Sequence, residues 1–146
     1  MEPSTAPLSA LAYVLRAKIG ITLVFWCVPL LLFPKNAFEW LGFREVGSVV
    51  FLKLLGMAYL ALVAGYYLGY REIASSVYPA NTVRVGIVSN LGAFLLLVYF
   101  SLAGSWDSWG ILAQLFMWAS LLATGSLSAA LVFFCTSVMK FPRKRV

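Results

Sequence analysis

Histidine is absent from the chain, and only five carboxylate side chains are present. Histidine is the commonest general base, the commonest metal ligand and a usual axial ligand of haem, so its absence excludes the usual designs for such sites. The acidic residues all fall in a terminus or between apolar runs, at Glu2, Glu39, Glu45, Glu72 and Asp107. No acid therefore lies inside a run to serve as a proton relay or a cation site. We expect no catalytic residues, no metal site and no cofactor, and the sequence favours a protein that is not an enzyme.

Charged residues are also scarce, at 11% of the chain against 62% hydrophobic residues, whereas soluble domains carry roughly 25% charged residues. A water-soluble fold of 146 residues could not hide so much apolar area, because small domains bury only about two thirds of their surface. The net charge of +6 comes from cations that flank apolar runs or form the tail Lys140, Arg143, Lys144 and Arg145. This pattern is typical of contact with anionic lipids. We expect the lipid bilayer as a partner and no binding to nucleic acid.

Four long apolar runs lie at about residues 10–33, 47–69, 83–104 and 109–139, and each is long enough to cross a bilayer. Each must be a helix, because an isolated strand in hydrocarbon would leave its backbone groups unpaired. The sequence therefore predicts an all-α fold, a four-transmembrane-helix bundle that forms a single membrane domain over residues 1–146. Pro29 should kink the first helix.

Lysine and arginine are distributed unevenly between the two sides that four crossings define. The side with both termini carries eight, namely Arg16, Lys18, Arg71, Arg84, Lys140, Arg143, Lys144 and Arg145, and the other side carries Lys35, Arg44 and Lys53. Because cytoplasmic loops are enriched in these residues, we expect both termini in the cytoplasm. The predicted location is the cytoplasmic (inner) membrane of the cell, crossed several times.

Two cations, Arg16 and Lys18, lie inside the first apolar run, and the third run contains Arg84 and Asn90. Arg16 and Lys18 could extend along the helix to the lipid head groups. Alternatively, they could form a polar cluster with Arg84 and Asn90 that faces a cleft and binds an anion such as a lipid head group. Candidate hydrogen-bond partners of Asn90 are Lys18, Thr124, Ser126 and Ser128. The sequence leaves both interpretations open.

Small residues recur at every fourth position in two of the runs. Such stripes allow close approach of membrane helices, and they predict packing within the bundle or between copies in a homo-oligomer: Ala61, Gly65 and Gly69 in the second run, and Ser120, Thr124 and Ser128 in the fourth. Between the first two runs, aromatic and charged residues alternate over 33–47. This segment is predicted to be an interfacial connector or a lid over a pocket.

Three segments carry a family resemblance: LRAKIG (15–20), LLGMAYLALVAGYYLGYRE (54–72) and VRVGIVSNLGAFLLL (83–97). With them the chain resembles the DoxX-like family of small four-helix integral membrane proteins. The resemblance implies a compact four-helix bundle in the cytoplasmic membrane and an association with quinone-linked thiosulfate oxidation. It supplies no catalytic residues that map onto this chain, and the lack of histidine and of a buried acid departs from what redox chemistry would need.

Two functions fit these observations. The first is an accessory or assembly subunit of a larger membrane complex, with other membrane proteins or further copies as partners. The alternative is a small oligomeric transporter or channel, or a carrier of a lipid- or quinone-like molecule, whose pocket would be shaped by Pro29, Tyr59, Tyr66, Tyr67 and Tyr99. A lipid-modifying enzyme is disfavoured, because no nucleophile–base pair can be assembled.

Overall fold

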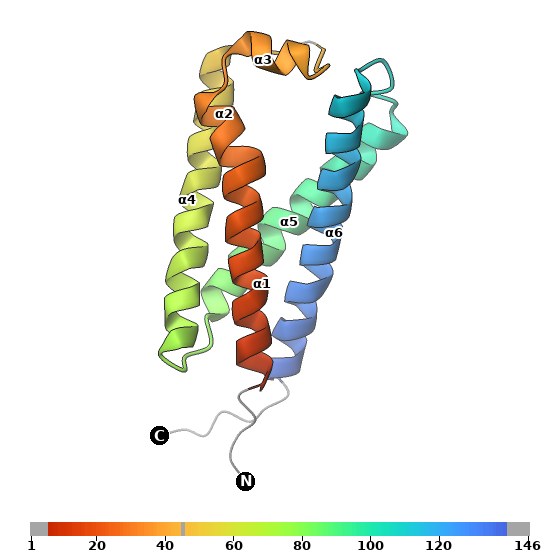
Figure 1. Cartoon of the computed structure of the whole chain (residues 1–146). Coiled ribbons are helices and arrows are strands. Elements are labelled where there is room, and N and C mark those ends of the chain that lie inside the picture. Colours follow the sequence, from red (N-terminus) through yellow and green to blue (C-terminus); the bar gives the residue numbers. More distant parts are fainter. Residues whose placement is uncertain (1–5, 45, 140–146) are drawn as a thin grey trace.

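The computed structural model describes residues 6–44 and 46–139, with side chains for residues 8–44 and 46–136. The predicted basic tail (Lys140, Arg143, Lys144 and Arg145) lies outside the described residues, as do Glu2 and Glu45. The described chain is helical, with α1 (Ala6–Thr22), the π-helical turn η1 (Leu23–Cys27), α2 (Val28–Leu32), α3 (Lys35–Trp40), α4 (Val49–Ala74), α5 (Ala80–Leu102) and α6 (Ile111–Met139) (Figure 1).

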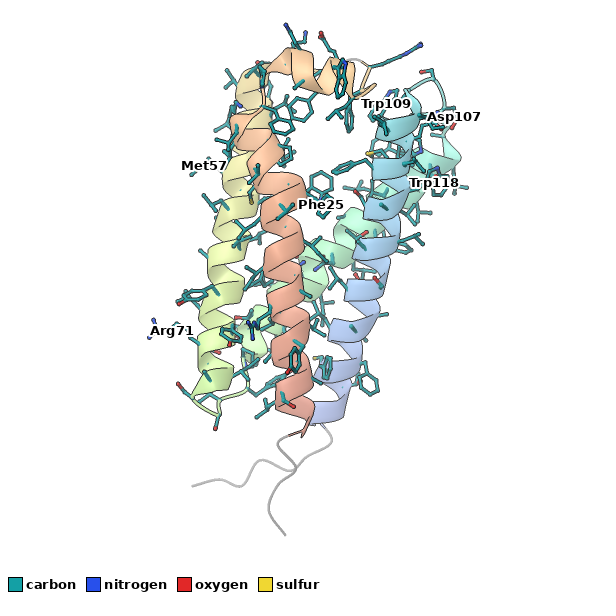
Figure 2. All side chains as sticks on the ribbon, viewed as in Figure 1. Phe25, Met57, Arg71, Asp107, Trp109 and Trp118 are labelled. Carbon is teal, nitrogen blue, oxygen red and sulfur yellow. The ribbon has the colours of Figure 1, made fainter. Side chains whose placement is uncertain are left out.

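Four helical stretches are long and apolar enough to cross a membrane, at Leu8–Leu32, Val49–Ala74, Ala80–Leu102 and Ile111–Thr136. This confirms the predicted all-α fold with four spanning helices, and it indicates a multi-pass membrane protein. Large apolar side chains such as Met57 and Trp118 lie on the outer surface, with 55% and 48% of their area exposed (Figure 2). Lipid is the solvent that suits such a surface.

The second helix extends beyond its predicted end at Gly69 and continues to Ala74, so that Arg71 and Glu72 form its last turn instead of a loop. Its first turn is capped by Ser48, whose hydroxyl accepts a hydrogen bond from the Val50 amide at 3.3 Å. Charged residues end an apolar run without ending the helix, because their side chains can reach water from the last turn.

The helices are arranged as two pairs, with α1 and α2 packed on α4, and α5 packed closely on α6. The pairs meet in a buried core of five side chains, Leu11, Leu15, Tyr66, Val83 and Leu131. This core lies at the end of the bundle where α1 begins and α6 finishes, and α5 crosses obliquely behind α1 (Figure 1). The opposite end, where α3 lies across the bundle, is called the α3 end below.

Close contacts between helices occur where glycine replaces a side chain. A Cβ atom at Gly69 would lie 2.5 Å from Thr82 of α5, one at Gly86 would lie 2.8 Å from Leu131 of α6, and one at Gly125 would lie 2.9 Å from Phe94. Of the predicted stripe in α4, Gly69 thus packs closely on α5. Gly65 has no neighbour within 4 Å of such an atom, and Ala61 is exposed.

The first membrane helix changes its winding directly before Pro29. The Val28 amide donates to the carbonyl of Leu23, five residues earlier, which completes the π-helical turn. Pro29 then lies in the first turn of α2, where its missing N–H is tolerated. A π-bulge is a recognised cause of helix bending, so the irregularity that Pro29 predicts takes the form of an extra residue in the preceding turn.

The α3 segment is held across its end of the bundle by backbone contacts. The Gly110 amide donates to the Gly42 carbonyl at 2.8 Å, and a Cβ atom at Gly42, whose φ is +92°, would lie 2.6 Å from the Cα of Gly110. The Lys53 amine donates to the carbonyls of Leu31 at 2.7 Å and Phe33 at 2.9 Å. These carbonyls end the first membrane helix, so Lys53 caps that helix where α3 branches off.

Candidate functional site

A cavity of about 470 Å³ lies between α1, α4, α5 and α6 and is called the central cavity here. This volume falls within the range of roughly 300–1,000 Å³ that is typical of small-molecule pockets. Its walls are mostly apolar, and several of their side chains are small, including Ala58, Ala93 and Ala123. The polar exceptions include Lys18, Tyr66, Ser89 and Asn90, which are joined to one another and are called the polar cluster below.

Lys18 belongs to the buried stripe of α1. The stripe consists of Leu11, Leu15, Lys18 and Thr22, whose spacings of four, three and four residues keep them on one helix face. Only 5% of Lys18 is exposed, and its amine donates to the Asn90 side-chain oxygen at 2.6 Å. The amine also lies 4.6 Å from the centre of the Tyr66 ring, a cation–π distance. Lys18 therefore points into the bundle and does not extend toward the head groups.

Asn90 is oriented by its own helix. It belongs to the buried face of α5 with Val83 and Gly86, and its amide nitrogen donates to the Gly86 carbonyl. The amide oxygen is thereby left to accept from Lys18. Ser89 donates to the same Gly86 carbonyl at 3.2 Å, so the 2.8 Å contact between Tyr66 and Ser89 is a bond in which the tyrosine hydroxyl donates.

The polar cluster lies deep in the spanning region. Lys18 is ten residues from the first residue of its span, Leu8, and Asn90 is ten residues from the first residue of α5, Ala80. At 1.5 Å per residue this is about 15 Å along each helix axis, about half of a hydrocarbon core roughly 30 Å thick. Intramembrane ionisable residues are rare and mark functional sites by default.

Lys18 has no carboxylate partner among the side chains that the structure describes. Within residues 6–44 and 46–139 the one ion pair joins Lys35 to Glu39 at 3.5 Å, on α3. A protonated lysine has three N–H donors, of which Asn90 accepts one. The amine therefore retains donor capacity and an unpaired charge at the wall of the cavity.

The other two predicted members of the cluster lie elsewhere. Arg16 is exposed, with its guanidinium 5.8 Å from the centre of the Tyr70 ring, and Arg84 is exposed on α5. The structure thus brings together Lys18 and Asn90, while neither arginine lines the central cavity.

The hydroxyl groups predicted as partners of Asn90 are directed to their own helix instead. Thr124 donates to the Ser120 carbonyl at 2.8 Å, Ser126 to the Ala123 carbonyl at 3.1 Å, and Ser128 to the Thr124 carbonyl at 2.8 Å. Ser120 and Thr124 line the central cavity, and Ser128 is buried. The stripe in α6 therefore contributes cavity wall as well as packing.

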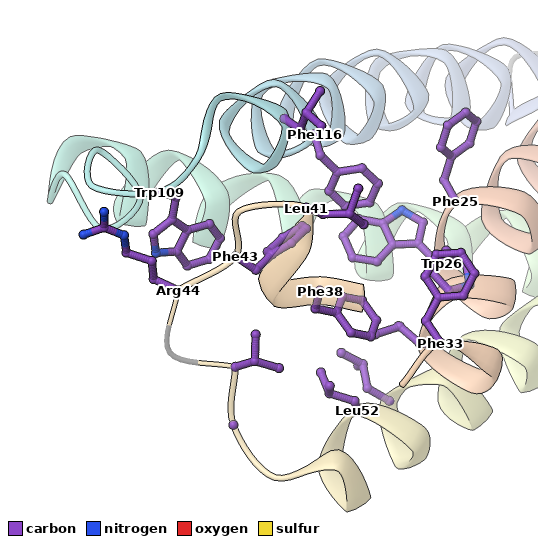
Figure 3. Close-up of a pocket in the computed structure, with 16 residues that line it drawn as sticks. Phe25, Trp26, Phe33, Phe38, Leu41, Phe43, Arg44, Leu52, Trp109 and Phe116 are labelled. Atoms are coloured by element: carbon purple, nitrogen blue, oxygen red, sulfur yellow. The ribbon is translucent and has the colours of Figure 1, made fainter. Parts of the chain in front are cut away.

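A second cavity of about 340 Å³ lies beneath α3 and is called the α3 cavity. Its lining is rich in aromatic rings, several of which group together in Figure 3: Trp26, Phe38, Phe43 and Phe116. The Trp26 and Phe116 rings are 5.0 Å apart, and the Phe43 and Phe116 rings are 5.9 Å apart. Arg44 lies at this cavity, with its guanidinium directed away from the rings (Figure 3).

Trp26 and Leu55 line both cavities and therefore lie between them. The sequence predicted an interfacial connector or a lid at 33–47 but gave no sign that Trp26 and Phe116, from two other helices, would meet beside this segment. Aromatic residues in a membrane helix are common at interfaces, so their number alone does not reveal an internal cluster.

The described side chains offer no metal site, since nowhere in residues 8–44 and 46–136 do three or more His, Cys, Asp or Glu side chains gather. Chemically, the central cavity is an apolar space in which Lys18 is the basic group among the described lining residues, with hydrogen-bonding neighbours beside it. Comparison with known proteins adds no relative: no family model, no curated protein and no solved structure matches this chain.

Proposed function

We propose that the protein binds a lipid- or quinone-like amphiphile in the central cavity and acts as a small membrane carrier or transporter for it. The apolar walls suit a hydrocarbon tail, and the polar cluster suits a hydrogen-bond-accepting head. A bundle that served only to hold its helices together would gain nothing from an open volume, because voids forfeit packing contacts.

The buried amine of Lys18 is the observation that carries this proposal. Burial of a cation without a counter-charge is unfavourable, and well-packed apolar side chains often replace buried charges without loss of stability. A lysine at the wall of an intramembrane cavity is therefore best explained by something that enters the cavity and contacts it. With the termini in the cytoplasm, as the distribution of cations predicts, the head group would lie on the cytoplasmic side of the tail.

An accessory or assembly role remains the second proposal. Apolar side chains such as Val88 and Leu95 are exposed on α5, but lipid covers such a surface as well as a partner helix would. The DoxX-like resemblance likewise stays a prediction, since it rests on the glycine and apolar positions of three segments.

Blocking the cavity tests the proposed function. Ala93 lines the central cavity, whereas Val88 on the same helix is 74% exposed to the outside, so Ala93→Phe and Val88→Phe form a matched pair. The protein is taken from its membrane into nanodiscs, and retained amphiphiles are measured by native mass spectrometry and solvent extraction. We expect a retained molecule in the wild type and in Val88→Phe, and its loss in Ala93→Phe. Equal retention in all three proteins, or none in the wild type, would contradict the proposal.

A further inference from the structure

The charge balance of the polar cluster identifies the class of head group. We infer that the amphiphile is a single-tailed monoanion, a long-chain carboxylate whose head pairs with the Lys18 amine. This inference rests on the proposed function, because it names the ligand of the same cavity.

The hydroxyl donors of the cluster are used within the protein. Ser89 and Asn90 both donate to the Gly86 carbonyl, and Tyr66 donates to Ser89. Within the polar cluster, the N–H groups of Lys18 beyond the one that Asn90 accepts and the second N–H of the Asn90 amide remain as free donors. A ligand head that contacts the polar cluster must therefore be a hydrogen-bond acceptor.

The charge of the cluster is a single positive charge. Among the described side chains, Lys18 is the one charged group that lines the central cavity. The described acidic residues lie elsewhere: Glu39 and Asp107 belong to the α3 end, and Glu72 is exposed in the last turn of α4. A neutral quinone carbonyl could accept a hydrogen bond but would leave this charge unbalanced. A carboxylate accepts the bond and balances the charge, and charge-assisted bonds are the stronger kind.

The shape of the cavity favours one tail. The amine is at the wall of a chamber of about 470 Å³, which is in the lower half of the usual range for pockets. Trp26 is eight residues farther along the first membrane helix, about 12 Å toward the α3 end. A tail that starts at Lys18 therefore runs along apolar wall to the aromatic boundary between the two cavities. A phosphate monoester would bring about −1.5 to −2 charge against the single positive charge of Lys18, and a two-tailed lipid would need more room.

The test compares two probes that differ only in the head group. Binding of radiolabelled hexadecanoate and of hexadecanol is measured on the full chain in nanodiscs of neutral lipid, at neutral pH so that the carboxylate and the amine both carry charge, against empty nanodiscs. We expect the wild type to prefer the carboxylate at least tenfold, which is the effect expected of a charge-assisted hydrogen bond in a buried site.

Three variants isolate the role of Lys18. Lys18→Met should weaken carboxylate binding at least tenfold and leave alcohol binding unchanged. Asn90→Asp keeps a partner for Lys18 and supplies an internal carboxylate, so it should also exclude the anionic probe while the alcohol still binds. Arg16→Gln removes an exposed cation two residues away on the same helix and should bind like the wild type.

The outcomes separate the two proposals. If the wild type binds both probes equally, or if Lys18→Met and Asn90→Asp bind the carboxylate like the wild type, the assignment of an anionic ligand is overturned and the proposed function stands. If the wild type binds neither probe and retains no amphiphile from its own membrane, the proposed function fails as well. Because Asn90→Asp preserves a pairing for the buried amine, a loss of carboxylate binding with intact alcohol binding does not result from misfolding.

Discussion

Disruption of the hydrogen bond between Lys18 and Asn90 should destabilise the fold more than the loss of an ordinary polar pair, because both side chains are buried. Each residue is 5% exposed, and the amine lies 2.6 Å from the amide oxygen. Asn90→Leu removes the acceptor and leaves the buried amine without a hydrogen-bond acceptor, which costs about 1–3 kcal/mol. In the Lys18→Met variant, Asn90→Leu removes an amide that no longer accepts from a charged donor. The additional loss of folding free energy should therefore be much smaller.

The difference between those two costs is the coupling energy of the pair. Hydrogen bonds to charged groups contribute about 1.5–3 kcal/mol, whereas polar pairs between membrane helices average only about 0.6 kcal/mol. The short distance, the burial and the position near mid-membrane all favour the upper range here. We therefore expect a coupling energy of about 1.5 kcal/mol or more.

A double-mutant cycle of reversible unfolding in mixed micelles measures this coupling, with helicity followed by circular dichroism. Lys53→Met combined with Asn90→Leu is the control, because Lys53 is bound to carbonyls at the α3 end and should be additive with Asn90. Independent sites add within about 0.3–0.5 kcal/mol. A coupling of that size or less for Lys18 and Asn90 would refute the reasoning that their contact is a strong, desolvated bond.

Three further results are expected. Gly42→Ala would place an alanine at a positive φ and its Cβ atom against the backbone of Gly110. Backbone hydrogen exchange over residues 35–44 should therefore accelerate. Unchanged exchange would show that this contact does not hold α3. Gly125→Ala should destabilise the fold by about 1–3 kcal/mol through its contact with the Phe94 ring, and Phe94→Leu should remove most of that cost; equal costs in both backgrounds would contradict the packing. Reporter domains fused to the two ends of the chain should both be found on the cytoplasmic side, and signals on opposite sides would contradict the predicted topology.

The four spanning helices could be predicted because hydropathy is a local property of the chain. The choice between Arg16 and Lys18 required one further step, since residues two apart on a helix cannot share a face. Lys18 continues the spacing of Leu11 and Leu15, the buried residues of α1, and Arg16 does not. The same spacing on α5 joins Val83 to Asn90 and leaves out Arg84, as the observed burial shows. Grouping all four residues into one cluster overlooked this periodicity.

The cavities could not be predicted in the same way, because they depend on how the helices cross. The α3 cavity combines Trp26 from the turn before Pro29 with Phe43 from the loop and Phe116 from α6. Nothing in the local sequence near any one of these residues indicates the other two. The π-helical turn adds to the difficulty, because one extra residue in a turn rotates every side chain before it relative to those after it.

The small residues show most clearly which part of the packing cannot be predicted from the sequence pattern. Small residues spaced four apart permit close contact between helices. At Gly69 and Gly125 a side chain from a neighbouring helix occupies the space beside the glycine. Ala58, Ala93 and Ala123 are equally small, but they face the central cavity. Where the opposite helix is near, a small side chain allows close packing; where it is distant, the same side chain leaves open space. The way the helices cross therefore determines which of the two occurs. In this bundle α5 packs closely on α6 but less extensively on α4, and the space left beside that crossing is where the polar cluster and its ligand would meet.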